Sequence, residues 1–328
     1  MHSRRTFIQK SGKGAAAALA LSSTPHLATK AFGNSSEKKK ITIGIIGAEN
    51  SHTRGFGKLF NIDKKFPGVE VKYVWGETEE FAKDAMEKGQ IPKMVKDPKE
   101  MLGKIDALIV DHRHGKFHLD AARPFVEAGI PSFIDKPFCY RLEEGVEFLK
   151  MARRVGTPVT SFSSIAQNAE TFDMAEQIKE IDPITHIIRS GRVDINSQYG
   201  GVFFYGPHII QPLMFMYSED VAKVRIIKND KNSGASLVFA DGTLASLVFT
   251  TQAYGWQTFV ETKDGIVELK PRVKEDYPGR TYVDMVEMFR TGKEPRSHES
   301  ILKGIAVLEA LEKSVESGQW EQVPAFSL

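Results

Sequence analysis

The sequence has a single cysteine, Cys139, so no disulfide can form within the chain. It has no apolar run of the roughly 18 residues that a membrane-spanning helix needs. It also lacks an excess of one charge, because 44 basic and 42 acidic residues give a net charge of +2, and no basic arm with interleaved aromatics is present. We therefore expect no disulfide framework, no membrane span and no nucleic-acid partner.

The turn after the first strand-like run lacks two glycines. Ile41–Ile46 leads into Gly47-Ala48-Glu49-Asn50-Ser51-His52, where a dinucleotide-binding domain has Gly-x-Gly-x-x-Gly. Glu49 takes the place of the second glycine, which lets the backbone approach a pyrophosphate, and His52 takes the place of the third. The turn stands where a dinucleotide-binding domain has its phosphate-binding turn, but its residues weaken the case for a bound dinucleotide.

The start of the chain is similar to a twin-arginine export signal. Arg4 and Arg5 stand within Ser3-Arg4-Arg5-Thr6-Phe7-Ile8-Gln9-Lys10, and an alanine-rich stretch follows. We expect residues 1–37 to be a signal peptide and linker, with cleavage near Ala31. The expected location is the periplasm, or otherwise outside the cytoplasm through the twin-arginine pathway.

The composition, 41% hydrophobic and 26% charged over 328 residues, is that of a globular protein of about two domains. Residues 38–160 alternate short buried strands with amphipathic helices, which predicts an α/β fold with a Rossmann-type doubly wound parallel sheet. The expected strands are 41–46, 69–74, 107–110, 132–134 and 158–161, and the expected helices are 54–60, 79–88, 116–128 and 142–154.

Residues 161–328 change to closely spaced strands joined by hairpin turns, at Asp241-Gly242 and Asp264-Gly265. This pattern predicts an α+β domain with a largely antiparallel open sheet. The expected strands are 184–194, 221–227, 236–239, 244–249, 257–261 and 266–269, and the expected closing helices are 281–291 and 299–317.

Chemical candidates follow the strands of the first domain, where an open α/β sheet binds its ligands. Lys136, in Asp135-Lys136-Pro137, directly follows 132–134 and could donate a hydrogen bond or a proton to a substrate oxygen. A surface lysine beside a turn proline is the alternative that spacing leaves open.

Several segments together resemble the glucose-fructose oxidoreductase / inositol dehydrogenase family, Gfo/Idh/MocA. They are Val110, His118, Ala121-Ala122, Glu127-Ala128-Gly129-Ile130-Pro131 and Asp135-Lys136-Pro137. The resemblance implies an NAD(P)-dependent oxidoreductase acting on a sugar, polyol or sugar derivative. It also implies that Lys136 serves both the nicotinamide ribose and the substrate. Exported members of the family are similar in having a twin-arginine signal.

The remaining site residues match the family pattern at some positions and depart from it at others. His208 resembles the family's catalytic histidine, with Tyr205 nearby as a substrate contact, but the aspartate expected four residues earlier is Phe204. For NAD or NADP, the implied contacts are Gly47, Ala48, Asn50, Ser51, Lys136 and Glu77. Glu77 stands one residue after the usual place of the ribose-binding acid.

The loop Asp111-His112-Arg113-His114 replaces the family's Thr-Pro and has three readings. As a substrate loop, His112 and Arg113 bind hydroxyls or a carboxylate. As a metal site, Asp111 or His112 joins Glu49, His52 or His208 around a divalent ion such as Zn²⁺ or Mn²⁺. As a helix entry, the histidines cap and pack.

Two further functions therefore stand beside the oxidoreductase. One is a metal-dependent sugar lyase or hydrolase, with Glu49, His52, His112 and His208 as ligands. The other is a non-catalytic carbohydrate-binding protein. In each case the expected partner is a small carbohydrate, and a homo-oligomer formed through the second-domain sheet is expected from family similarity.

Overall fold

The computed structural model describes residues 40–181 and 183–328. The expected signal peptide and linker at 1–37 lie outside these residues. None of the helices in the described part is both long and apolar enough to cross a membrane.

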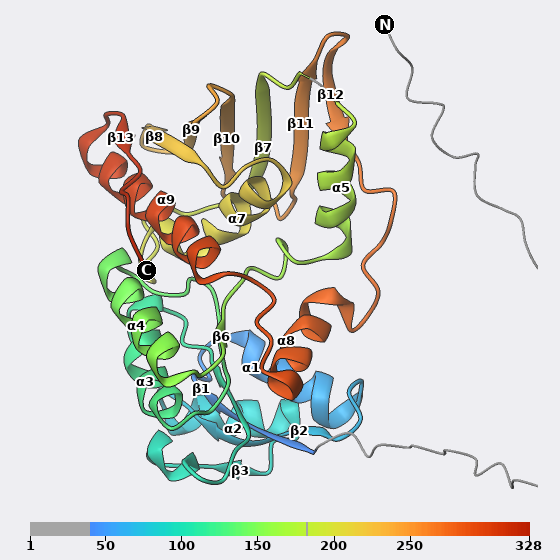
Figure 1. The fold of residues 1–328 in the computed structure, drawn as a ribbon, viewed down its shortest axis with the longest axis vertical. Coiled ribbons are helices and arrows are strands. Elements are labelled where there is room, and N and C mark those ends of the chain that lie inside the picture. The colour runs from blue at the N-terminus through green and yellow to red at the C-terminus, as the bar shows by residue number, and fades with distance from the viewer. Residues whose placement is uncertain (1–39, 182) are drawn as a thin grey trace, which may run out of the picture. The chain divides into compact units, whose positions relative to one another are not determined.

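The first sheet has six parallel strands in the order β3-β2-β1-β4-β5-β6, which confirms the predicted Rossmann-type sheet (Figure 1). Helices cover both of its faces, so successive positions of its central strands β1, β4 and β5 are buried. The strands are β1 (Ile41–Ile46), β2 (Val69–Trp75), β3 (Lys93–Met94), β4 (Ala107–Val110), β5 (Ser132–Ile134) and β6 (Val159–Thr160).

The helices of this half pack on opposite faces of the sheet. Helices α1 (Ser51–Gly57) and α2 (Glu79–Gly89) share one buried cluster with β1, while α3 (His118–Glu127) and α4 (Leu142–Val155) share the other. Helix α1 begins three residues before the predicted start, because the Asn50 side chain accepts a hydrogen bond from the His52 N–H and caps it. A π-helical turn, η1 (Lys58–Ile62), continues α1, and two 3-10 turns, η2 (Pro98–Met101) and η3 (Gly115–Phe117), precede β4 and α3.

The second sheet has seven strands in the order β12-β11-β7-β10-β9-β8-β13. Every pairing is antiparallel except β7 with β10, so the prediction of a largely antiparallel sheet is confirmed. Both predicted hairpins are present, between β9 and β10 and between β11 and β12. The strands are β7 (His186–Arg192), β8 (Val221–Lys228), β9 (Ser233–Phe239), β10 (Leu244–Thr250), β11 (Gln257–Thr262), β12 (Gly265–Leu269) and β13 (Glu321–Gln322).

Four helices accompany this sheet, and three of them are not among the predicted elements. These three are α5 (Ala169–Lys179), α6 (Val202–Tyr205) and α7 (Pro207–Met216), and the fourth is α9 (His298–Ser317). Every residue of α7 except Phe215 is buried, and Pro212 stands inside it. The helix therefore shows no alternation of polar and apolar faces by which a sequence would reveal it.

The helix α8 (Gly279–Thr291) comes late in the chain but packs on the first sheet (Figure 1). Its Met285, Val286, Met288 and Phe289 join the same buried cluster as β1 and α1. The face of the Rossmann sheet that carries α1 is thus completed by residues more than 230 positions away from β1.

Candidate functional site

The turn after β1 lies directly against the end of β4. Gly47 has a φ of 107°, a left-handed conformation that favours glycine. A Cβ at Gly47 would lie 2.6 Å from the backbone nitrogen of His112. The Gly47 N–H donates a hydrogen bond of 2.9 Å to the carbonyl of Trp75. The one glycine kept from the dinucleotide pattern is therefore required by the close approach of neighbouring segments.

The carboxylate of Glu77 holds this turn from the end of β2. Its Oε2 accepts hydrogen bonds from the N–H groups of Ala48 and Glu49, at 2.8 and 2.9 Å, and its Oε1 lies 2.9 Å from His112 Nδ1. Burial by itself would raise the pKa of Glu77, but the hydrogen bonds from His112 and from the two amides lower it to about 2. Glu77 is thus a charged internal link between the turn and the loop after β4.

The side chain of Glu49 reaches across to the second half of the chain. Its Oε1 accepts a hydrogen bond of 2.5 Å from the Tyr199 hydroxyl and lies 3.8 Å from Arg113 Nη1. The Arg113 guanidinium in turn stacks over the Tyr199 ring, 4.2 Å from its centroid. We call Glu49, Arg113 and Tyr199 the clasp, because they join the first turn to the segment before α6.

Two histidines in and after the loop that follows β4, His112 and His118, are buried. The ring of His112 is buried against Trp75, Phe117 and His118. Burial lowers the pKa of His118 to about 4, and its two ring nitrogens contact the carbonyls of Pro137 and His112. Two residues of this loop were predicted to bind substrate. Arg113 lines a large cavity, whereas His112 is buried and does not line it.

That cavity, of about 700 Å³, opens at the carboxyl edge of the Rossmann sheet. It is lined on one side by Ala48, Glu49, Asn50, Ser51 and His52 and on the other by Lys136, Phe204, Tyr205, His208 and Trp256. A smaller cavity of about 320 Å³ shares Ser51, His52, Lys136 and His208 with it. The structure thus brings the predicted catalytic pair, Lys136 and His208, to the same cavity wall.

Lys136 is 5% exposed, yet its ammonium has no hydrogen-bond or ion-pair partner within residues 40–181 and 183–328. Its Nζ lies 5.1 Å from the ring centroid of Phe204 and 5.7 Å from that of Tyr205. Two aromatic faces stabilise the charge only in part, because an ammonium has three donors. The side chain is therefore ready to bind an oxygen atom of a ligand.

A serine orients His208 in place of the missing aspartate. His208 Nδ1 lies 2.7 Å from Ser163 Oγ, and the Ser163 N–H donates to Gln211 Oε1 at 2.7 Å. Burial, together with the positive charges of Lys136 and His52, holds the pKa of His208 well below its ordinary value. The imidazole is consequently neutral at pH 7, with Nε2 as its second polar atom.

An aromatic wall stands beside His208. The Trp256 ring lies 5.8 Å from that of His208, and it packs on Gly191, where a Cβ would be 2.2 Å from the indole. Tyr254 lies next to Tyr205, with their hydroxyl groups 2.9 Å apart. Aromatic faces of this kind pack well against the C–H faces of a sugar ring.

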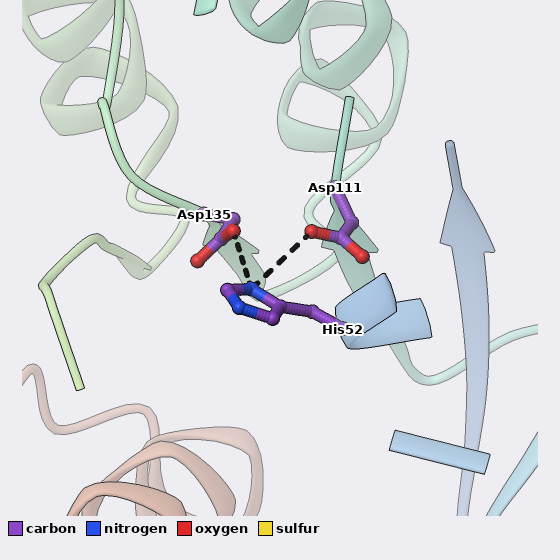
Figure 2. A group of neighbouring side chains, drawn as sticks. All are labelled: His52, Asp111 and Asp135. Carbon is purple, nitrogen blue, oxygen red and sulfur yellow. Dashed lines mark hydrogen bonds and ion pairs between the residues drawn. The ribbon is translucent and has the colours of Figure 1, made fainter. Parts of the chain in front are cut away.

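Three ionisable side chains meet at the carboxyl edge of the sheet, each from a different segment (Figure 2). His52 is in the first turn of α1, while Asp111 and Asp135 directly follow β4 and β5. His52 Nδ1 lies 2.9 Å from Asp135 Oδ2 and 3.9 Å from Asp111 Oδ1. The two carboxylates are 0% and 4% exposed, whereas the His52 side chain is 40% exposed and lines both cavities.

Asn50 and Thr53 hold the two carboxylates in place. The Asn50 amide nitrogen donates to Asp111 at 2.8 Å and to Asp135 at 3.3 Å, and the Thr53 hydroxyl donates to Asp111 at 2.6 Å. Burial and the nearby charge of Asp135 raise the pKa of Asp111 well above its ordinary value. Burial also acts to raise the pKa of Asp135, but the charge and hydrogen bond of His52 outweigh it and lower that pKa.

The residues predicted to hold a dinucleotide fit only part of one. Glu77, the expected ribose acid, has both oxygens engaged and does not line the cavity. The buried ring of His112 fills the space beside it, and Glu49 puts a carboxylate where a pyrophosphate would approach the turn. The nicotinamide and substrate end fits, whereas the adenosine diphosphate end does not fit in the position usual for this fold.

Asp135, Tyr199 and Ser163 are the site residues that the sequence reasoning did not single out. Asp135 carried a signal, since it directly follows a predicted strand beside Lys136. Tyr199 and Ser163 carried none, because they precede α6 and follow β6 in irregular segments.

Comparison with known proteins agrees with this architecture. The sequence model of GFO_IDH_MocA, an oxidoreductase family with an NAD-binding Rossmann fold, matches residues 41–163. No curated protein sequence matches the chain.

Solved structures share the whole fold at low sequence identity. GenD2 from gentamicin A biosynthesis, in complex with NAD, is 13% identical with a TM-score of 0.74, over 88% of this chain and 97% of GenD2. Myo-inositol dehydrogenase from Lactobacillus casei, in complex with NAD(H) and myo-inositol, is 14% identical with a TM-score of 0.72, over 88% and 98%. The chain therefore has the two-sheet fold of these proteins, and its residues 41–163 are similar in sequence to the NAD-binding domain of the Gfo/Idh/MocA oxidoreductases.

Proposed function

We propose that the protein is an NAD(P)-linked oxidoreductase that acts on a sugar, polyol or sugar derivative. The observation that carries the proposal is the meeting of Lys136 and His208 on one cavity wall. The match of residues 41–163 to an oxidoreductase family and the likeness to inositol dehydrogenases support it. A nicotinamide supplies the hydride acceptor or donor in this class of reaction.

The residues of the cavity supply binding and proton transfer. The Lys136 ammonium donates a hydrogen bond to a substrate oxygen, because it has no other partner. When His208 carries its proton on Nδ1, it donates to Ser163 Oγ and leaves the Nε2 lone pair free to accept a hydroxyl proton. Trp256 and Tyr254 pack against the ring of the substrate.

Binding of NAD or NADP tests this proposal directly. The full chain is titrated with NAD and NADP by calorimetry, and thermal unfolding is followed in parallel. We expect saturable binding of at least one nucleotide, and reduction of bound nucleotide when inositols, hexoses and their acids are added. Absence of binding by both nucleotides at millimolar concentration would refute the nicotinamide part of the proposal.

We also propose that two copies pair through the outer face of the second sheet. Exposed apolar side chains gather there on three strands, namely Ile227 of β8, Leu244 and Val248 of β10, and Ile266 of β12. Light scattering of the purified chain should give the mass of a dimer or larger oligomer, and Val248→Lys should shift it to the monomer. A monomeric wild-type chain contradicts this.

For the location, we propose export through the twin-arginine pathway, which rests on the Ser3–Lys10 pattern. The expected result is accumulation of the chain outside the cytoplasm, and its loss when Arg4 and Arg5 are both replaced by lysine. Equal cytoplasmic retention of both forms would contradict it.

A further inference from the structure

We propose that His52, Asp111 and Asp135 form a binding site for one divalent cation, Zn²⁺ or Mn²⁺, beside the two cavities that His52 lines. Each residue offers one ligand atom, and no two of these atoms are more than 4.8 Å apart. Around a tetrahedral ion with bonds of 2.0–2.2 Å, two ligand atoms lie about 3.3–3.6 Å apart, so side-chain movements on the order of 1 Å would bring all three onto one ion. Two of the separations are already close to this, because His52 Nδ1 lies 2.9 Å from Asp135 Oδ2 and 3.9 Å from Asp111 Oδ1.

The ligand set matches the chemistry of these ions. One imidazole nitrogen and two carboxylate oxygens suit Zn²⁺ or Mn²⁺, whereas Mg²⁺ and Ca²⁺ prefer oxygen ligands alone. The three residues come from the ends of β4 and β5 and from the start of α1, all at the same edge of the sheet. Rigid elements thus fix the position of every ligand.

Hydrogen bonds from outside the trio already orient the carboxylates. Asn50 donates to both aspartates, and Thr53 donates to the second oxygen of Asp111. Such donors leave a carboxylate able to bind a metal through its remaining lone pairs, and they are typical partners of metal-binding carboxylates. Thr53 is itself fully buried, and its Oγ1 also lies 2.7 Å from the Gly47 carbonyl oxygen, so its position is set by the turn.

A separate observation points to a ligand at the same place. The Lys136 side chain is 5% exposed, its ammonium has no hydrogen-bond or ion-pair partner within the described residues, and it lines both cavities that His52 lines. Two adjacent buried carboxylates call for a cation, and an ammonium without a partner calls for an oxygen ligand. A cation that carries a water or a substrate hydroxyl satisfies both.

The other residues that the sequence suggested for a metal have partners elsewhere. Glu49 belongs to the clasp, His112 is bonded to Glu77, and His208 is bonded to Ser163. The site therefore keeps His52 and Asp111 from the sequence hypothesis and adds Asp135.

The test measures metal binding without nucleotide or substrate, so its outcome is independent of the nicotinamide proposal. The full chain, produced without a polyhistidine tag and stripped with a chelator, is titrated separately with ZnCl₂ and MnCl₂ by calorimetry. Metal content after dialysis is measured by mass spectrometry. We expect one equivalent of Zn²⁺ or Mn²⁺ and a rise in the melting temperature.

Variants assign the ligands. His52→Gln, at a half-exposed position that tolerates change, should weaken the affinity by about 100-fold, and Asp135→Asn should do the same. Thr53→Val should weaken it by about 10-fold, while His114→Gln should leave it unchanged. Sub-stoichiometric binding by the wild-type chain, or wild-type affinity in His52→Gln, would overturn the proposal.

Discussion

His112 Nδ1 lies 2.9 Å from the carboxylate of Glu77, and this contact joins the loop after β4 to the segment after β2. The same carboxylate receives the two amides of the turn after β1. Glu77, one residue after the usual place of the ribose-binding acid, is here part of the internal structure. The turn and the loop after β4 therefore behave as one unit.

The first prediction concerns this unit. Replacing Glu77 by glutamine removes a charged acceptor of three hydrogen bonds, and we expect it to lower the free energy of unfolding by about 1–3 kcal/mol. Urea denaturation at pH 7 measures the loss. Glu80→Gln, an exposed change on the rim of the cavity, is the control and should alter stability by less than about 0.5 kcal/mol.

The pH dependence of this loss follows from the pKa of Glu77. It is about 2 in the folded chain and 4.5 ordinarily, so the unfolded chain binds the proton more readily. The stabilisation by Glu77 is therefore complete above pH 4.5 and declines as the pH falls toward 2. The difference between wild type and Glu77→Gln should shrink over this range, and a constant difference would contradict the role of the charge.

The second prediction concerns His208. Burial and the charges of Lys136 and His52 hold its pKa well below the ordinary 6.5, so the ring should still be neutral where a free imidazole is half protonated. Imidazole ¹⁵N shifts should therefore show no protonation midpoint near pH 6.5, with His208→Gln used to identify the signals. Because its folded pKa is depressed, His208 also costs stability as the pH falls below 6.5. A titration midpoint near 6.5 would show that the ring is not buried as described.

Lys136 is the subject of a third prediction, in which stability and function separate. Lys136→Met keeps the apolar stem and removes an ammonium without a partner, so the free energy of unfolding should stay unchanged or rise by about 0.5–2 kcal/mol. The affinity for the sugar or polyol substrate, or its turnover, should fall by at least about 100-fold. Lys116→Met, at an exposed position, is the matched control for both measurements. A large loss of stability in Lys136→Met would mean that the ammonium supports the fold.

The fourth prediction concerns the clasp. Glu49→Gln keeps a hydrogen-bond acceptor for Tyr199 but removes a negative charge from the place where a pyrophosphate approaches the turn. We expect its affinity for NAD or NADP to exceed that of the wild type by about tenfold, since one screened charge pair is worth on the order of 1 kcal/mol. Calorimetry with both nucleotides measures this. Equal or weaker binding would show that Glu49 does not oppose the phosphates.

The fold followed from local patterns because strands buried on both faces are unbroken apolar runs, as at Ala107–Val110, and because glycine and proline stand between elements. The helix α7 did not, since an almost fully buried helix has no polar face and Pro207 and Pro212 resemble loop residues. Position along a strand predicted that Lys136 and the loop after β4 would meet the turn.

Side-chain direction was beyond such reasoning. His112 and Arg113 are neighbours in sequence, yet one ring packs inward against Trp75 and the other side chain reaches Tyr199. That choice depends on aromatic partners contributed by β2 and by the segment before α6. The meeting of Asp135 with His52 likewise depends on the order of strands in the sheet, which places β5 beside β4 and β4 beside β1.

The return of α8 to the first sheet has a consequence for biosynthesis. Met285 to Phe289 complete a core that otherwise ends at Phe162, so one face of the early sheet stays open while the intervening residues are made. At ordinary rates of translation this interval lasts roughly 6 to 25 seconds. The Rossmann half is therefore not finished when residue 163 has been made, and its last layer is added only after Phe289 has been made.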